Sequence, residues 1–97
     1  MKIKTMEDKK TNEKSESQNI TVQLLNIDGD VTTYDDVKFI TIVSKKYNLI
    51  IMKDYLPIIG EIDGTVEIGR ENENIQLGEL RGYFMHKHNK FNLFYRE

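Results

Sequence analysis

Short runs of alternating apolar and polar residues start near residue 20 and continue to the end of the chain. Val22 and Leu24, for example, are separated by Gln23, which is the period of a strand with one buried face. No window of about 11 residues repeats the i, i+3, i+4, i+7 spacing of an amphipathic helix. We therefore expect strands at 20–27, 31–34, 37–45, 49–52, 56–59, 66–68, 75–80, 82–87 and 90–95.

Turn residues separate these runs at short intervals. In the Asp28-Gly29-Asp30 triplet, Gly29 can supply the positive φ of a tight turn, and His88-Asn89 joins the last two runs. Asp35-Asp36 indicates a corner, and Pro57 restricts its segment to a sheet edge. In contrast, the continuous apolar run at 49–52 is typical of a strand covered on both faces. The pattern predicts an all-β fold, a two-sheet antiparallel β-sandwich or flattened barrel of about nine to ten short strands.

The first 18 residues differ from the rest of the chain. They contain five lysines and four acidic residues, with polar residues filling most of the other positions. High charge with low hydrophobicity is typical of disordered segments. We expect residues 1–18 to form a disordered charged tail and residues 19–97 to form the single folded domain.

Composition and charge narrow the possible functions. The chain of 97 residues has a formal net charge of -2, so no overall positive field attracts DNA or RNA. It has no cysteine, which excludes disulfides, thiolate metal sites and cysteine nucleophiles. No apolar run approaches the ~18–20 residues that cross a bilayer, and the charged start does not resemble a signal peptide. We expect a cytoplasmic protein without membrane insertion.

Candidate metal ligands are sparse. His86 and His88 would share one strand face, but zinc usually takes three or four protein ligands and no third candidate is near. We interpret both as solvated histidines beside a hairpin tip. The closely spaced acidic residues lack the spacing of a calcium loop and are more typical of turns and corners. They are Asp28, Asp30, Asp35 and Asp36.

Catalytic and nucleic-acid motifs are equally weak. Ser44 is the only serine outside the tail and no strand-to-helix elbow surrounds it, while the glycines are scattered at turns rather than gathered in a phosphate loop. We therefore expect no catalytic residue, no cofactor and no metal. A few basic and aromatic residues lie close together near the end of the chain, but we assign these aromatics to the core and its rim. They are Lys87, Lys90, Arg96, Phe91 and Tyr95.

A more specific signal is the order of short motifs. Five segments carry it: 26-NIDGDV-31, 47-YNLIIMKDYLPI-58, 62-IDGTVEI-68, 80-LRGYFM-85 and 89-NKFNLF-94. In this order they resemble the N-terminal β-sandwich of the ε subunit of F-type rotary ATP synthases and F-type-like ATPases. Each motif alone is unspecific, but the collinear series spans nearly the whole folded part.

Departures from that family are specific. Tyr47 and Ile50 stand where the family has loop glycines, Tyr55 replaces its loop histidine, and Tyr83 replaces the second glycine of a pair. The sequence also ends where the family usually adds a C-terminal domain of two helices. We therefore expect the inhibitory and ATP-sensing roles of those helices to be absent.

The resemblance implies a non-catalytic rotor part that grips a γ-like shaft subunit and rests on a ring. By position, the segment that faces the shaft comprises Tyr55, Leu56, Ile58 and Gly60, and the segment near the ring or base comprises Lys46, Tyr47 and Asn48. The plainer interpretations remain open: a rim tyrosine that covers Pro57, and an ordinary solvated turn at 46–48.

The same resemblance implies which proteins the chain binds. Its partners would be the shaft, α/β-type nucleotide-binding subunits and possibly a c-ring, in a complex at the inner face of the cell membrane. Two alternatives stay open. The chain could serve a specialised F-type-like ATPase not coupled to protons, such as a motility motor, or it could be a free β-sandwich adaptor that binds a peptide or protein.

Overall fold

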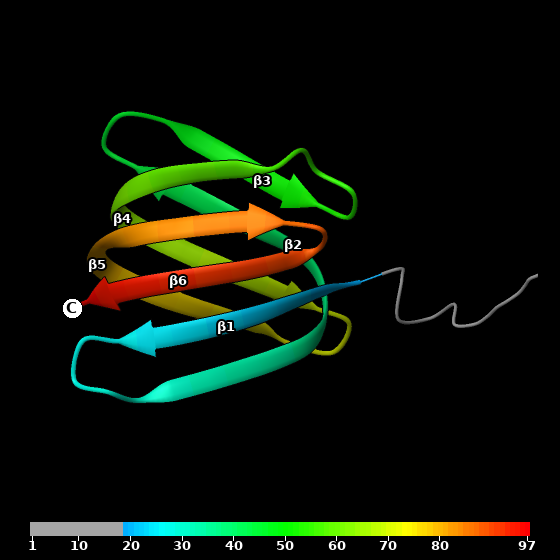
Figure 1. Cartoon of the computed structure of the whole chain (residues 1–97), viewed down its shortest axis with the longest axis horizontal. Coiled ribbons are helices and arrows are strands. Elements are labelled where there is room, and N and C mark those ends of the chain that lie inside the picture. Colours follow the sequence, from blue (N-terminus) through cyan, green and yellow to red (C-terminus); the bar gives the residue numbers. More distant parts are fainter. Residues whose placement is uncertain (1–18) are drawn as a thin grey trace, which may run out of the picture.

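The computed structural model describes residues 19–97, which form six strands (Figure 1). The charged tail expected at 1–18 lies outside the described residues. Within 19–97 there is no helix long and apolar enough to span a bilayer. The strands are β1 (Ile20–Asn26), β2 (Val31–Ser44), β3 (Asn48–Met52), β4 (Ile58–Arg70), β5 (Asn74–Lys87) and β6 (Lys90–Arg96).

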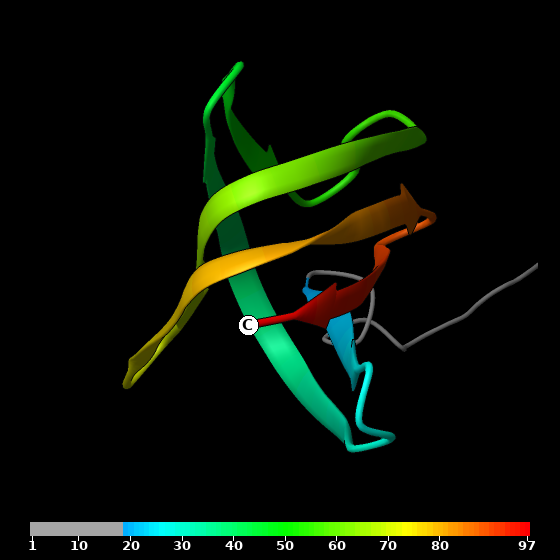
Figure 2. The same cartoon turned by 90° about the vertical axis from the view of Figure 1, so that its left-hand side faces the viewer.

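The strands close into a small barrel. Their order in the sheet is β1-β6-β5-β4-β2-β3, and an additional pairing of β1 with β2 closes a ring of five strands, with β3 attached to β2 (Figure 2). β1 runs parallel to β6, whereas the other pairs are antiparallel. The all-β prediction is confirmed. The predicted two-sheet antiparallel sandwich of nine to ten short strands is wrong, because the structure has six strands in a mixed five-strand barrel.

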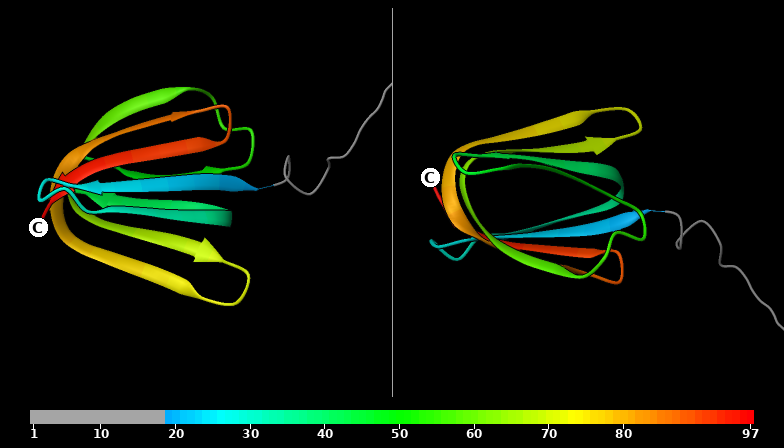
Figure 3. Two further views of the ribbon diagram at one scale, coloured as in Figure 1. Left: turned by 60° about the horizontal axis from the view of Figure 1, so that its bottom comes forward. Right: turned by 90° about the horizontal axis from the view of Figure 1, so that it is seen from above.

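Continuous long strands explain the smaller number. β2, β4 and β5 have 14, 13 and 14 residues, and each joins segments that the sequence pattern separates. β2 runs through Asp36, whose φ is 59°, with a register shift between Val37 and Phe39, and β4 shifts register between Gly64 and Val66. Such bulges bend a strand without ending it. β4 and β5 curve round one end of the barrel, so their halves lie in opposite walls (Figure 3).

The core fills the barrel with inward-facing side chains. Ile40 and Ile42 of β2 are buried, as their alternation predicts. The rings of Phe84 and Phe91 stack with their centroids 5.4 Å apart. The full set of buried apolar residues is Ile20, Val22, Leu24, Val37, Ile40, Ile42, Ile51, Ile62, Val66, Ile68, Leu80, Phe84, Phe91 and Leu93. These residues supply the apolar burial that stabilises a domain without disulfides.

Two turns form as predicted, but β3 is not buried on both faces. Gly29 has a φ of 100° between β1 and β2, and His88-Asn89 joins β5 to β6. In β3, however, Ile51 is buried whereas Ile50 and Met52 are 56 % and 58 % exposed. The prediction of a strand covered on both faces is therefore wrong. β3 has the ordinary alternation of a strand with one face in the core.

Candidate partner-binding surface

His86 is a core residue rather than a metal ligand. Its side chain has no exposed surface, whereas His88 is exposed in the turn, so the expectation of two solvated histidines is wrong for His86. The alternation of β5 places His86 on the same inward side as Phe84. Among residues 19–97 there is no group of three or more histidine, cysteine or acidic side chains that could hold a metal.

Aromatic rings surround the His86 imidazole. The ring of Tyr55 lies edge-on at a centroid distance of 6.5 Å, and that of Phe91 lies at 6.3 Å. Neither imidazole nitrogen has a hydrogen-bond partner among the described residues. Burial without a partner disfavours the charged form and lowers the pKa of His86. The neutral imidazole therefore acts as packing beneath Tyr55.

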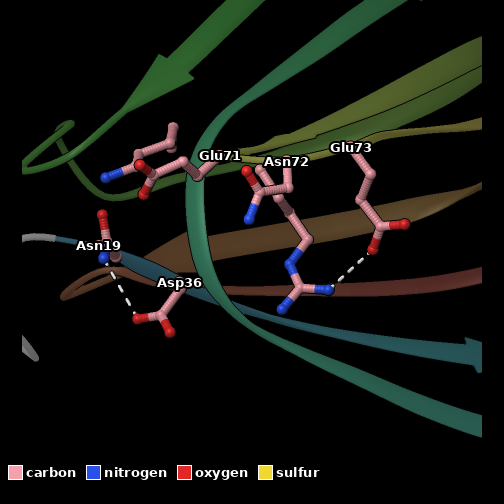
Figure 4. Close-up of a pocket in the computed structure, with 7 residues that line it drawn as sticks. Asn19, Asp36, Glu71, Asn72 and Glu73 are labelled. Atoms are coloured by element: carbon pink, nitrogen blue, oxygen red, sulfur yellow. Dashed lines mark hydrogen bonds and ion pairs between the residues drawn. The ribbon is translucent and has the colours of Figure 1, made fainter.

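A polar pocket beside β2 does not form a chemical site. It has a volume of about 500 Å³ and lies between β2 and the turn that joins β4 to β5 (Figure 4). Arg70 Nη1 lies 3.0 Å from Glu73 Oε2, and Asn19 Nδ2 donates to Asp36 Oδ1 at 3.2 Å. The pocket lining mixes acidic and basic side chains, so it offers no concentrated charge of one sign for a substrate. Its remaining lining residues are Lys38, Glu71 and Asn72.

The segment expected to face a shaft spans the loop after β3 and the start of β4. Leu56 is 76 % exposed, and Tyr55 is half-buried against the core. Ile58 is also half-buried against the core, and a Cβ added to Gly60 would lie 2.6 Å from Phe84 Cε1. Thus Leu56 projects outward, whereas Ile58 and Gly60 face inward. Ile59, which the sequence interpretation omits, is 71 % exposed on the opposite side of β4.

Hydrogen bonds fix the loop at 53–57. The Asp54 backbone N–H donates to Asn89 Oδ1 at 2.7 Å, and Asn89 Nδ2 donates to Asp54 Oδ1 at 3.1 Å. The Tyr55 N–H donates to the carbonyl of Met52 at 3.1 Å. The loop is therefore tied to the turn between β5 and β6. A loop ordered in this way loses little conformational entropy when it binds a partner.

The segment expected near a ring forms the turn between β2 and β3. Lys46 and Asn48 are exposed, and the Ser44 N–H donates to the carbonyl of Tyr47 at 2.9 Å. The Tyr47 hydroxyl donates to the carbonyl of Glu61 at 2.6 Å, and burial together with the Glu61 charge raises the pKa of Tyr47. Tyr47 thus connects this turn to β4. The two expected partner segments lie at opposite ends of β3 (Figure 1).

A third surface, which no sequence motif predicts, lies on the outer side of the barrel wall. Tyr83 and Phe94 are direct partners across β5 and β6, and Met85 and Ile59 are direct partners across β5 and β4. All four are strongly exposed. We call these residues, together with Leu25 of β1, the outer strip. Its signal in the sequence was the position of Tyr83 and Met85 in antiphase to buried Phe84 and His86.

Comparison with known proteins gives a result at the level of the fold. No protein-family model matches the chain, and no curated protein does. Solved structures do match, including a chain in the cryo-EM structure of the central stalk and c-ring of the mitochondrial ATP synthase of Tetrahymena thermophila. The TM-score is 0.62 at 18 % identity, over 84 % of this chain. This chain has the fold of a component of that assembly.

That match confirms the resemblance to rotary ATP synthases inferred from the motif order, as a likeness of fold. The alignment spans 66 % of the length of the Tetrahymena chain.

Proposed function

We propose that the chain is a non-catalytic, ε-like central-stalk subunit of a rotary F-type or F-type-like ATPase. It binds a γ-like shaft subunit and helps to assemble and couple the rotor. The observation that carries the proposal is the fold match, which extends over 84 % of the chain. The order of sequence motifs supports it independently, because it points to the same type of assembly without any coordinates.

The shaft contact is assigned to the loop at 53–57 and the start of β4. Leu56 projects from a loop that Asp54 and Asn89 hold in place, so it can act as an apolar anchor. Tyr55 contributes its exposed edge while its ring packs over His86. The half-buried Ile58 and the Gly60 that accommodates Phe84 shape the surface from below.

The contact with a ring or base is assigned to the turn between β2 and β3. Lys46 and Asn48 supply exposed polar groups, and Tyr47 holds the turn against β4 through its bond to Glu61. The proposed complex also contains α/β-type nucleotide-binding subunits and lies at the inner face of the cell membrane. Coupling to protons through a c-ring and use in a specialised, proton-independent motor are both compatible with these surfaces.

Purification from the native organism tests the role. A tagged full-length chain should recover α/β-type nucleotide-binding subunits and a γ-like subunit, identified by mass spectrometry. Leu56→Asp should reduce recovery of the γ-like subunit, whereas Ile50→Asp, an exposed aliphatic site on β3, should not. If the tagged chain recovers other proteins but no nucleotide-binding subunit, it is a free adaptor instead and the proposal fails.

A further inference from the structure

Two adjoining strands present matched rows of outward side chains. The inward positions of β5 and β6 are buried, so alternate residues of both strands face solvent. The cross-strand partners on this face are Arg81 with Arg96, Tyr83 with Phe94, Met85 with Asn92, and Lys87 with Lys90. The face is thus apolar in the middle and basic at both ends.

The apolar middle extends onto the neighbouring strands. Phe94 lies opposite Leu25 of β1, and Met85 lies opposite Ile59 of β4. Tyr83 is 63 % and Phe94 56 % exposed. A groove of about 410 Å³ runs beside them and reaches Ile27. Large exposed aromatic and aliphatic side chains on adjoining strands are typical of protein interaction sites.

The basic residues at both ends of this face are expected to destabilise the sheet, and a role in binding would explain their presence. Like charges placed directly opposite each other on paired strands destabilise a sheet. Nevertheless, Arg81 lies opposite Arg96, and Lys87 lies opposite Lys90. Within residues 19–97, the one ion pair of these four cations joins Arg81 Nε to Asp63 Oδ2 at 3.8 Å.

Carboxylates near the face are concentrated at its arginine end. Glu61 lies opposite Tyr83, and Glu79 and Glu97 line the rim beside Arg81 and Arg96. Neither Lys87 nor Lys90 forms an ion pair within the described part of the chain. The acidic side chain at this end is Asp54, which is bonded to Asn89 in the turn and paired with Lys53. The lysine end is therefore the part of this face that best attracts an acidic partner.

The backbone pairing determines what kind of segment can bind. Residues 81–86 of β5 and residues 90–95 of β6 are paired on both sides, so an extended peptide cannot add to these strands as a further strand. Lys90 and Arg96 are six residues apart along β6, which is about 20 Å. A helix with a diameter of about 10–12 Å fits between them and satisfies its own backbone groups.

We propose that the outer strip binds an amphipathic helix of another protein. The helix carries an apolar stripe that covers Tyr83, Phe94 and Met85, and acidic side chains on the flank that faces Lys87 and Lys90. The inference uses none of the residues assigned to the shaft contact, although the lysine end of this surface adjoins the turn to which the loop at 53–57 is bonded.

Synthetic helices can test the proposal on the full chain. The probe is a helical peptide of about five turns with leucines at i, i+3, i+4 and i+7 and glutamates beside them. The matched control peptide carries lysines in place of the glutamates. We expect the acidic peptide to bind with a Kd of about 1–100 μM, about 10-fold or more tightly than the basic one, and to weaken with added salt.

Variants of the chain localise the binding. Phe94→Ser and the double variant Lys87→Glu/Lys90→Glu should each lower the affinity for the acidic peptide about 10-fold or more. Ile50→Ser is the matched control, because Ile50 on β3 is also 56 % exposed. A thermal melt accompanies each variant, and Tyr83→Ser replaces Phe94→Ser if that variant unfolds.

Several results would overturn the proposal. Equal binding of the acidic and basic peptides would remove the charge argument. Absence of binding up to about 1 mM acidic peptide, or binding that the variants leave unchanged, would place no helix on this face. The proposal would also fail if the chain bound phosphatidylcholine vesicles that contain phosphatidylglycerol but did not bind the peptide, and if the same variants abolished vesicle binding. The face would then be assigned to an anionic membrane.

Discussion

The two loops at the ends of β3 are held in different ways. The loop at 53–57 is secured from below and from the side, because Tyr55 packs on buried His86 and Asp54 is bonded to Asn89. The turn at 45–47 has its own backbone bonds, and the Lys45 N–H donates to the carbonyl of Asp63 at 3.0 Å. The Tyr47 hydroxyl donates to the carbonyl of Glu61, and the Tyr47 ring is half-buried against the core. Both loops therefore contact the core through a half-buried tyrosine, but the first is bonded through side chains to the turn between β5 and β6, whereas the second is bonded to β4.

This difference has a functional consequence. A loop anchored in the core presents Leu56 in a fixed position, which suits a contact that must transmit torque through the proposed shaft interface. A turn with exposed Lys46 and Asn48 suits a more adaptable polar contact.

Gly60→Val should be the most damaging change. The added Cβ would lie 2.6 Å from Phe84 Cε1, and Phe84 is itself stacked on Phe91, so the ring has little room to move. We expect a loss of about 3 kcal/mol in the free energy of unfolding, the upper part of the range for overpacked cores. Urea denaturation measures it. A loss below about 0.5 kcal/mol would show that the barrel is loosely packed beside the loop.

Tyr55→Ala should cost about 2 kcal/mol of unfolding free energy, because it removes half-buried aromatic contacts over His86. Tyr55→Phe is the matched control and should be close to neutral, since Tyr55 makes its described contacts through the ring. Chemical denaturation of both variants provides the values. An alanine variant as stable as the phenylalanine variant would contradict the idea that this loop is anchored in the core.

Acid should weaken the same anchor. The pKa of His86 is lowered in the folded state, so the unfolded chain binds an additional proton once the pH falls below the ordinary histidine value of about 6.5. Stability should therefore be constant above this pH and should decrease below it by up to about 1.4 kcal/mol per pH unit, until the folded pKa is reached.

Denaturation between pH 7.5 and 5 measures this dependence. His86→Leu should flatten the profile, whereas replacement of exposed His88 by Gln should leave it unchanged. A profile that responds to His88 rather than to His86 would contradict the assignment.

Tyr47→Phe should have the smallest effect of the series. It removes the hydrogen bond of 2.6 Å to the carbonyl of Glu61 and keeps the ring in place. Since one such bond contributes about 1 kcal/mol at most sites, we expect a loss of about 0.5–1 kcal/mol in unfolding free energy, with faster amide exchange at 45–48. A loss larger than that of Tyr55→Ala would show that the turn at 45–47 is anchored more strongly than the loop at 53–57.

The sequence predicts local features of this fold better than distant ones. The alternation at Ile40 and Ile42 identifies the inward face, and Gly29 identifies a turn, because both signals depend on neighbouring residues. Asp36 was interpreted as a corner, but a residue with positive φ is compatible with a bulge as well as a turn. The pairing of β1 with β6 joins the two ends of the domain, and no local pattern encodes it.

The candidate surfaces divide in the same manner. The segments at 46–48 and 55–60 could be located by motif order, yet the inward direction of Ile58 and Gly60 depends on the phase of a strand that begins only after Pro57. His86 is a polar residue at an inward position, so its burial follows from β5 as a whole. The outer strip emerges only when β1, β6, β5 and β4 are placed side by side.

Site-specific cross-linking tests the proposed stalk position most directly. A photoreactive amino acid at Leu56, and separately at Ile50 as a control of similar chemistry on β3, is introduced into the full chain in its native organism. Illumination of the purified complex should join position 56 to a γ-like subunit that accompanies α/β-type nucleotide-binding subunits, with position 50 remaining unlinked to it. A cross-link from position 56 to an unrelated protein, in a preparation without nucleotide-binding subunits, would contradict the account.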